Sequence, residues 1–85
     1  MTRQNSIRKE ILLQLYASRL PLSVEHMQRE AKKNDYDYTV TEMKNESQFL
    51  ADDSLIVQVA NPGSTEIKYR ILSAGVRQYE QTYAA

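Results

Sequence analysis

Residues 55–72 read LIVQVANPGSTEIKYRIL, and this stretch decides the fold that the sequence predicts. Its two ends, residues 55–60 and 66–72, are rich in β-branched and aromatic side chains, which favour strands. Residues 61–65 between them are turn formers, with Pro62 and Gly63 placed where neither interrupts a strand. The stretch is therefore predicted to form a β-hairpin. Because an isolated hairpin is only marginally stable in water, its apolar face needs a covering layer of helices.

The alternation of side chains along both strands indicates one buried face and one solvated face. The first strand divides into two alternating sets, Leu55, Val57 and Val59 in one and Ile56, Gln58 and Ala60 in the other. In the second strand, Lys68 and Arg70 alternate with apolar or aromatic residues. Both cations are therefore expected to project from the outer face of the hairpin.

Helical patterns before the hairpin supply the covering layer. The first helix is predicted over residues 6–19, with Ser6 as its N-cap and Pro21 beyond its end. Its apolar stripe is broad enough for the central helix of a small core, and contains Ile7, Ile11, Leu12 and Leu15. The second helix is predicted over residues 23–34, with Ser23 as its N-cap and Asn34 as a left-handed C-cap.

The third helix is predicted over residues 39–52. Thr39 and Glu42 have the spacing of a capping box at its start. One face of this helix is apolar, with Val40, Met43, Ser47 and Leu50 at helical spacing. The other face is therefore expected to be exposed, and it presents Thr41, Glu42, Lys44, Asn45 and Gln48.

A fourth helix is predicted after the hairpin, over residues 73–83, with Ser73 as its N-cap. Val76, Tyr79 and Tyr83 lie on one face at helical spacing, so this face packs on the core or on a partner. Gly75 in the first turn costs about 1 kcal/mol relative to alanine, which favours close packing at that position.

The composition limits the classes of protein that the chain can represent. Its 85 residues are predicted to form one domain, residues 1–85, and its charged fraction of 26% is typical of a soluble globular protein. No apolar run approaches the roughly 20 residues that span a bilayer, and residues 1–5 lack the apolar segment of a secretory signal. The chain is therefore expected to be cytoplasmic and to make no membrane contact. It has no cysteine, so no disulfide or thiolate metal site is expected.

Three phrases of the sequence resemble the winged helix-turn-helix family. The end of a recognition helix and the start of the next strand resemble residues 49–57, FLADDSLIV. The start of the helix after the wing resembles residues 72–76, LSAGV. The entry to the second helix resembles residues 20–23, LPLS. The likeness covers residues 6–80 and is closest to small proteins of bacteriophages and prophages and to the wing domains of transcriptional regulators. It implies an α+β fold with three N-terminal helices, a β-hairpin wing and a C-terminal helix.

The resemblance implies binding to double-stranded DNA, with helix 39–52 in the major groove and wing residues 61–65 on an adjacent backbone. Lysine, asparagine and glutamine on the helix suit base edges, and cations on the surrounding framework suit phosphates. The candidates are Thr41, Lys44, Asn45 and Gln48 on the third helix, Lys68 and Arg70 on the wing, and Arg8 and Lys9 on the first helix. Arg3 lies at the same end of the first helix as Arg8.

The net charge keeps a second function open. Eleven basic and eleven acidic residues cancel, whereas dedicated DNA-binding proteins are usually basic. Regulators of this class usually carry arginine or lysine on the third helix, but here Glu42 and Glu46 accompany a single Lys44. The alternative is a protein-interaction module, with Tyr79 and Tyr83 as candidates for contact with a homodimer partner or another protein.

An enzyme, a metal site and a cofactor are not expected. His26 is the only histidine, and a metal needs more ligands than His26 and its helical neighbour Glu30. No serine in a strand-to-helix elbow accompanies a second base. Two glycines, Gly63 and Gly75, are too few for a glycine-rich phosphate loop.

Overall fold

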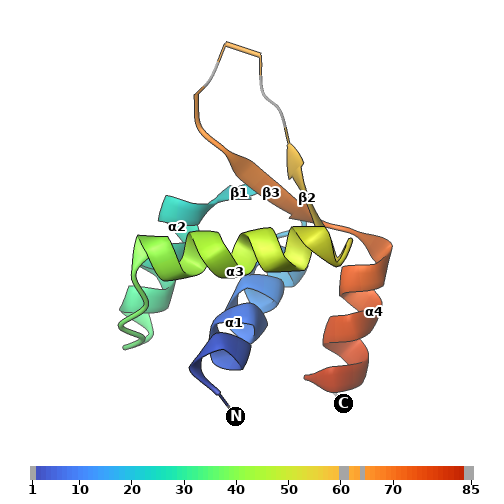
Figure 1. Cartoon of the computed structure of the whole chain (residues 1–85), viewed down its shortest axis with the longest axis horizontal. Coiled ribbons are helices and arrows are strands. Elements are labelled where there is room, and N and C mark those ends of the chain that lie inside the picture. The colour runs from blue at the N-terminus through green and yellow to red at the C-terminus, as the bar shows by residue number, and fades with distance from the viewer. Residues whose placement is uncertain (1, 60–61, 64, 84–85) are drawn as a thin grey trace.

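The computed structural model describes residues 2–59, 62–63 and 65–83. Its elements, in chain order, are α1 (Arg3–Ser18), β1 (Leu22–Ser23), α2 (Val24–Lys33), α3 (Val40–Asp52), β2 (Ile56–Val59), β3 (Lys68–Ile71) and α4 (Ser73–Thr82). Figure 1 shows the helices gathered on one side of a small sheet, with β2 and β3 extending away from them toward Pro62 and Gly63. Helix α3 crosses in front of α1, and α4 packs beside α1.

The sheet is antiparallel, with strand order β1-β3-β2. The predicted α+β class and the hairpin are therefore confirmed. Strand β1 was not predicted, because two residues are too few to show an alternating pattern. Ser23 ends this strand and also caps α2, so a single residue serves two elements.

Pairing in the sheet shows which residues face the core. Directly opposed residues share a face, and Ile56 pairs with Ile71 while Leu22 pairs with Tyr69. Ile56 and Tyr69 are buried, so this face packs on the helices. Lys68 and Arg70 occupy the opposite face, as the alternation predicted.

The two hairpin strands are shorter than predicted. Strand β2 spans Ile56–Val59 and β3 spans Lys68–Ile71, so Thr65, Glu66 and Ile67 belong to the connection. Of the residues predicted in the first strand and the turn, Ala60, Asn61 and Ser64 lie outside the described residues.

Two predicted N-caps are confirmed. The Ser23 Oγ accepts a hydrogen bond of 3.1 Å from the His26 amide at the start of α2. At the start of α3, the Thr39 hydroxyl accepts from the Glu42 amide and the Glu42 carboxylate accepts from the Thr39 amide, both at 3.1 Å. This reciprocal pair is the capping box, and it holds the Glu42 side chain beside the first turn.

The prediction of Ser6 as an N-cap is wrong. Helix α1 begins at Arg3, and the hydroxyl of Thr2 accepts from the amide of Asn5 at 3.1 Å. The Ser6 amide donates to the Thr2 carbonyl, so Ser6 lies inside the first turn. The earlier start adds Arg3 to the helix, where it can reach α3.

Two other predicted helix ends also differ. Asn34 has φ −97°, and the left-handed residue is Asp35 with φ 67°. The Asn34 side chain instead donates to the Glu30 carbonyl, which satisfies that carbonyl without a left-handed cap. The N-cap of α4 is Leu72, which makes no side-chain capping bond, so the prediction of Ser73 as the cap is wrong.

Helix α1 is the centre of the core. Its apolar stripe of Ile7, Ile11, Leu12 and Leu15 is almost fully buried, as predicted. Residues from α2, α3, the sheet and α4 pack against it, namely Val24, Met27, Ala31, Met43, Leu50, Ile56, Tyr69 and Tyr79. This core fixes the position of α3 and leaves the outward side of that helix uncovered.

Candidate nucleic-acid interface

The outward face of α3 carries Thr41, Lys44, Asn45 and Gln48, which we call the reading face. All four side chains are exposed, and their spacing places them on one side of the helix. Gln48 donates a hydrogen bond of 2.9 Å to Asp52 one turn later. Within the described residues, no hydrogen bond or ion pair holds the side chains of Thr41, Lys44 and Asn45. The reading face is therefore polar and carries one unpaired cation.

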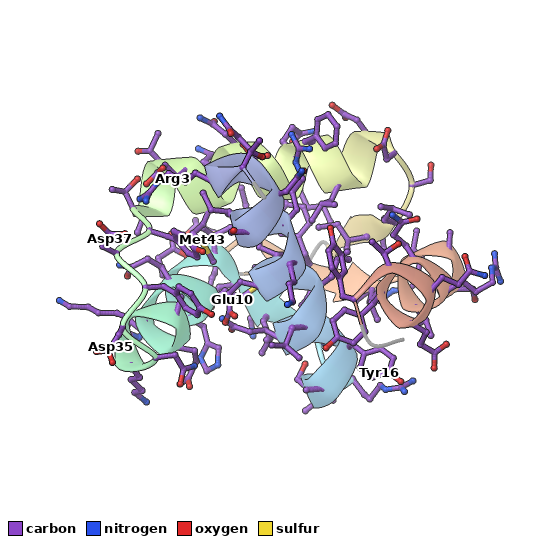
Figure 2. The ribbon with its side chains drawn as sticks, turned by 90° about the horizontal axis from the view of Figure 1, so that it is seen from below. Arg3, Glu10, Tyr16, Asp35, Asp37 and Met43 are labelled. Atoms are coloured by element: carbon purple, nitrogen blue, oxygen red, sulfur yellow. The ribbon has the colours of Figure 1, made fainter. Side chains whose placement is uncertain are left out.

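The two glutamates of α3 lie on its flank and are paired with α1. Arg3 donates two hydrogen bonds to the Glu42 carboxylate, at 2.6 and 3.0 Å, and a third to the Asp37 carboxylate at 3.2 Å. Figure 2 shows Arg3 and Asp37 beside the start of α3. Arg8 donates to Glu46 at 2.7 Å. The acidic residues that made α3 an unpromising DNA-binding helix are thus neutralised within the fold.

Arg8 and Lys9 both have partners within the fold. The Arg8 guanidinium lies 3.7 Å from the centre of the Phe49 ring in addition to pairing with Glu46. The Lys9 ammonium lies 5.9 Å from the centre of the Tyr83 ring, beside α4. The two residues predicted on the DNA surface from α1 therefore contact the rest of the fold.

A groove separates α3 from the hairpin. It is lined by residues of α2, α3, β3 and the hairpin loop, namely Val24, Glu25, Arg29, Val40, Lys44, Thr65, Glu66, Ile67 and Tyr69. A smaller hollow next to it contains Arg29 again, with His26, Glu66 and Lys68. Arg29 therefore lines both openings, the groove together with Lys44 and the smaller hollow together with Lys68.

Arg70 points to a different region. It lines a hollow with Arg19 and with Leu72, Ser73 and Val76 at the start of α4. The predicted wing pair shares one face of β3, but Lys68 lines a hollow with Arg29 whereas Arg70 lines a hollow with Arg19. In the predicted wing tip, residues 61–65, Pro62, Gly63 and Thr65 are exposed, and the other two residues lie outside the described residues.

The tyrosines of α4 are used inside the fold. Tyr79 is 9% exposed, and its ring centre lies 4.7 Å from that of Tyr16 and 6.0 Å from that of Tyr83. Tyr83 is half-buried and packs against the core. Removing the Tyr79 side chain would therefore leave a cavity in the core, whereas the Tyr83 side chain is partly exposed to solvent.

No group of three or more histidine, aspartate or glutamate side chains is placed to hold a metal ion in the part of the chain that the structure describes. His26 lines two hollows, one between α1 and α2 and the other with Arg29 and Lys68. None of the helices that the structure describes combines the length and the apolar character needed to cross a membrane.

Replacing Glu42 by glutamine is expected to remove a pH-dependent part of the stability. The pKa of Glu42 falls from its ordinary value of 4.5 to about 2, chiefly because Arg3 hydrogen-bonds its carboxylate, and the Thr39 amide adds to this. A pKa lowered by folding stabilises the folded state above the unfolded pKa, and this stabilisation is lost as the pH falls toward the folded pKa.

The wild type should therefore be more stable than Glu42→Gln at neutral pH, and the difference should shrink from about pH 5 down to about pH 2. Urea unfolding of both proteins across this range measures the difference. Arg3→Gln should show the same convergence, because it removes the other half of the pair. A difference that stayed constant with pH would show that the Glu42 charge contributes nothing to stability.

No protein-family model, curated protein or solved structure matches the chain. The account of the site therefore depends on its own geometry. Sequence reasoning missed Arg29, although an exposed cation on the polar side of α2 was visible in the pattern. It also missed the pairing of Arg3 with Glu42, which are 39 positions apart.

Proposed function

We propose that the chain is a winged-helix protein that binds double-stranded DNA as a small regulator of transcription, with α3 in the major groove. The order of elements supports this assignment: a short strand follows the first helix, two helices follow it, and a hairpin closes an antiparallel sheet before a last helix. An α-helix fits the major groove, and a hairpin loop beside it is placed to meet the adjacent backbone.

The observation that carries the proposal is the distribution of charge around α3. Glu42 and Glu46 are paired with Arg3 and Arg8 on the side of α1. The reading face is thereby left with Thr41, Lys44, Asn45 and Gln48. Asparagine can form two hydrogen bonds with adenine, and lysine can donate to guanine, so these side chains have the chemistry to read base edges.

Arg29, Lys44 and Lys68 are assigned to phosphate contacts on arbitrary DNA, and Lys44 also has the chemistry to reach a base edge. Arg29 and Lys44 line the groove, and Arg29 and Lys68 line the hollow next to it. Phosphate contacts set the position and register of a protein on DNA. Glu25 lines the groove and Glu66 lines both openings, and their negative charges lower the affinity for arbitrary DNA.

The alternative of a protein-interaction module has less support. It depended on an exposed acidic face of α3 and on the tyrosines of α4. The glutamates of α3 are paired with α1, and Tyr79 belongs to the core. Both features are thus used within the fold.

The contact surface can be mapped by NMR. Isotope-labelled protein is titrated with a random-sequence duplex at low salt, and the backbone amide signals are followed. We expect the largest shifts from Thr41 to Gln48 in α3 and at Lys68 and Arg29. Signals of the exposed side of α4, such as Arg77, serve as the internal control and should not move. Shifts confined to α4 would contradict the proposed orientation.

A further inference from the structure

The two α3 glutamates lie close to the reading face without belonging to it. Glu42 follows Thr41 and Glu46 follows Asn45, so each glutamate is about 100° around the helix from a reading-face residue. An α-helix with its side chains is only about 10–12 Å wide. A carboxylate on its flank therefore lies within about one Debye length, roughly 8–10 Å, of phosphates that border the groove. If left unpaired, either glutamate would repel DNA.

Arg8 covers Glu46 more completely than an ordinary surface partner does. Its Nε donates to the Glu46 Oε1 at 2.7 Å, and the side chains of Arg8 and Glu46 are 24% and 14% exposed. The guanidinium also lies on the Phe49 ring and donates to Asn5 at 3.3 Å. These contacts come from α1 and from α3, so the guanidinium is held in one place over the flank.

Arg3 performs the same role at the start of α3. It binds both oxygens of Glu42 and also the side chain of Asp37. Its guanidinium carbon lies 5.2 Å from the centre of the Tyr38 ring. The two arginines of α1 thus pair with both glutamates of α3, and Arg3 also pairs with Asp37, which precedes that helix.

We propose that Arg3 and Arg8 are positioning residues for DNA recognition, which act by neutralising Glu42 and Glu46 beside the reading face rather than by touching DNA. The inference rests on the proposed function. It assigns α1 a role in binding that differs from direct contact with phosphates. It also explains how a chain of zero net charge can present a helix that is compatible with DNA.

Arg8 gives a clearer test than Arg3, because Glu46 is its single carboxylate partner among the residues that the structure describes. Glutamine can replace either residue and removes the charge while keeping a polar side chain. Arg8→Gln leaves Glu46 unpaired and should weaken binding to a random-sequence duplex by about three- to tenfold at low salt. Arg8→Gln combined with Glu46→Gln removes the exposed charge, and its affinity should return to within about twofold of the wild type. Arg8→Lys keeps the charge and should also bind nearly as the wild type does.

A matched control separates local charge from total charge. Arg8→Gln combined with Glu80→Gln has the same total charge as the rescued protein, but its neutralised carboxylate is on α4, where Glu80 accepts from the Tyr16 hydroxyl. Its affinity should remain as low as that of Arg8→Gln. Thermal unfolding of every variant shows whether each is folded at the temperature of the binding measurement.

The variants test the role of Arg8, whereas binding of the wild type tests the proposed function. If Arg8→Gln with Glu46→Gln binds as weakly as Arg8→Gln alone, Arg8 acts by direct contact or by holding α3, and the inference is overturned. Equal recovery with Glu80→Gln would also overturn it, because only total charge would matter. If the wild type itself does not bind the duplex at low salt, the proposed function fails.

Discussion

Replacing Gly75 by alanine should lower the free energy of unfolding by about 2–3 kcal/mol, although alanine is the better helix former by about 1 kcal/mol. A Cβ at this position would overlap the backbone carbonyl oxygen of Leu55 and would come within 2.8 Å of the Ile71 side chain. The same Leu55 oxygen accepts a hydrogen bond of 2.9 Å from the Leu72 amide. Helix α4 would have to move away and weaken this bond.

Thermal unfolding measures the effect, and a loss of this size corresponds to about 10–20 °C in the melting temperature of a domain of this length. Ser73→Ala is the matched control, because Ser73 is exposed at the start of the same helix and makes no capping bond. Its effect should be within about 0.5 kcal/mol. An unchanged melting temperature for Gly75→Ala would contradict the close approach of α4 to Leu55.

Replacing Arg29, Lys44 and Lys68 together by glutamine should have the largest effect on DNA binding. These residues lie around the groove between α3 and the hairpin and the hollow next to it. Each phosphate contact contributes about one unit to the slope of log affinity against log salt. The triple variant should therefore lose about 100-fold in affinity at low salt and about three units of slope.

The control for this triple variant changes three cations elsewhere. Lys32, Lys33 and Arg77 lie on the end of α2 and on α4, and all are exposed. Their replacement by glutamine lowers the total charge by the same three units. Affinity should fall much less, because these residues are not beside the groove. Similar losses for both variants would show that DNA responds to total charge and not to this surface.

Much of the fold was predictable because its signals are local. The capping box of α3 needs only Thr39 and Glu42, three positions apart, and the hairpin needs a turn between two β-rich runs. The packing at Gly75 was also predicted, since an otherwise costly glycine in a helix calls for a nearby neighbour. Strand β1 was missed because two residues carry no periodic signal.

The candidate site was less predictable because its charges pair over long distances in the sequence. The place of Arg8 and Lys9 on α1 predicts phosphate contacts, but it does not show that Arg8 pairs with Glu46 of α3 or that Lys9 lies 5.9 Å from the centre of the Tyr83 ring. That Arg29 lines one opening with Lys44 and another with Lys68 depends on how α2 packs beside the hairpin. A charge count of zero could not show that the two glutamates of α3 are paired with arginines of α1.

On the proposed function, a chain without net charge binds the DNA backbone through one face. The affinity of the wild type for a random-sequence duplex tests this, measured by fluorescence anisotropy at several salt concentrations. The account predicts binding at low salt that weakens steeply toward physiological salt, with a slope of about three, because phosphate contacts release counterions. No binding at low salt, or binding independent of salt, would contradict it.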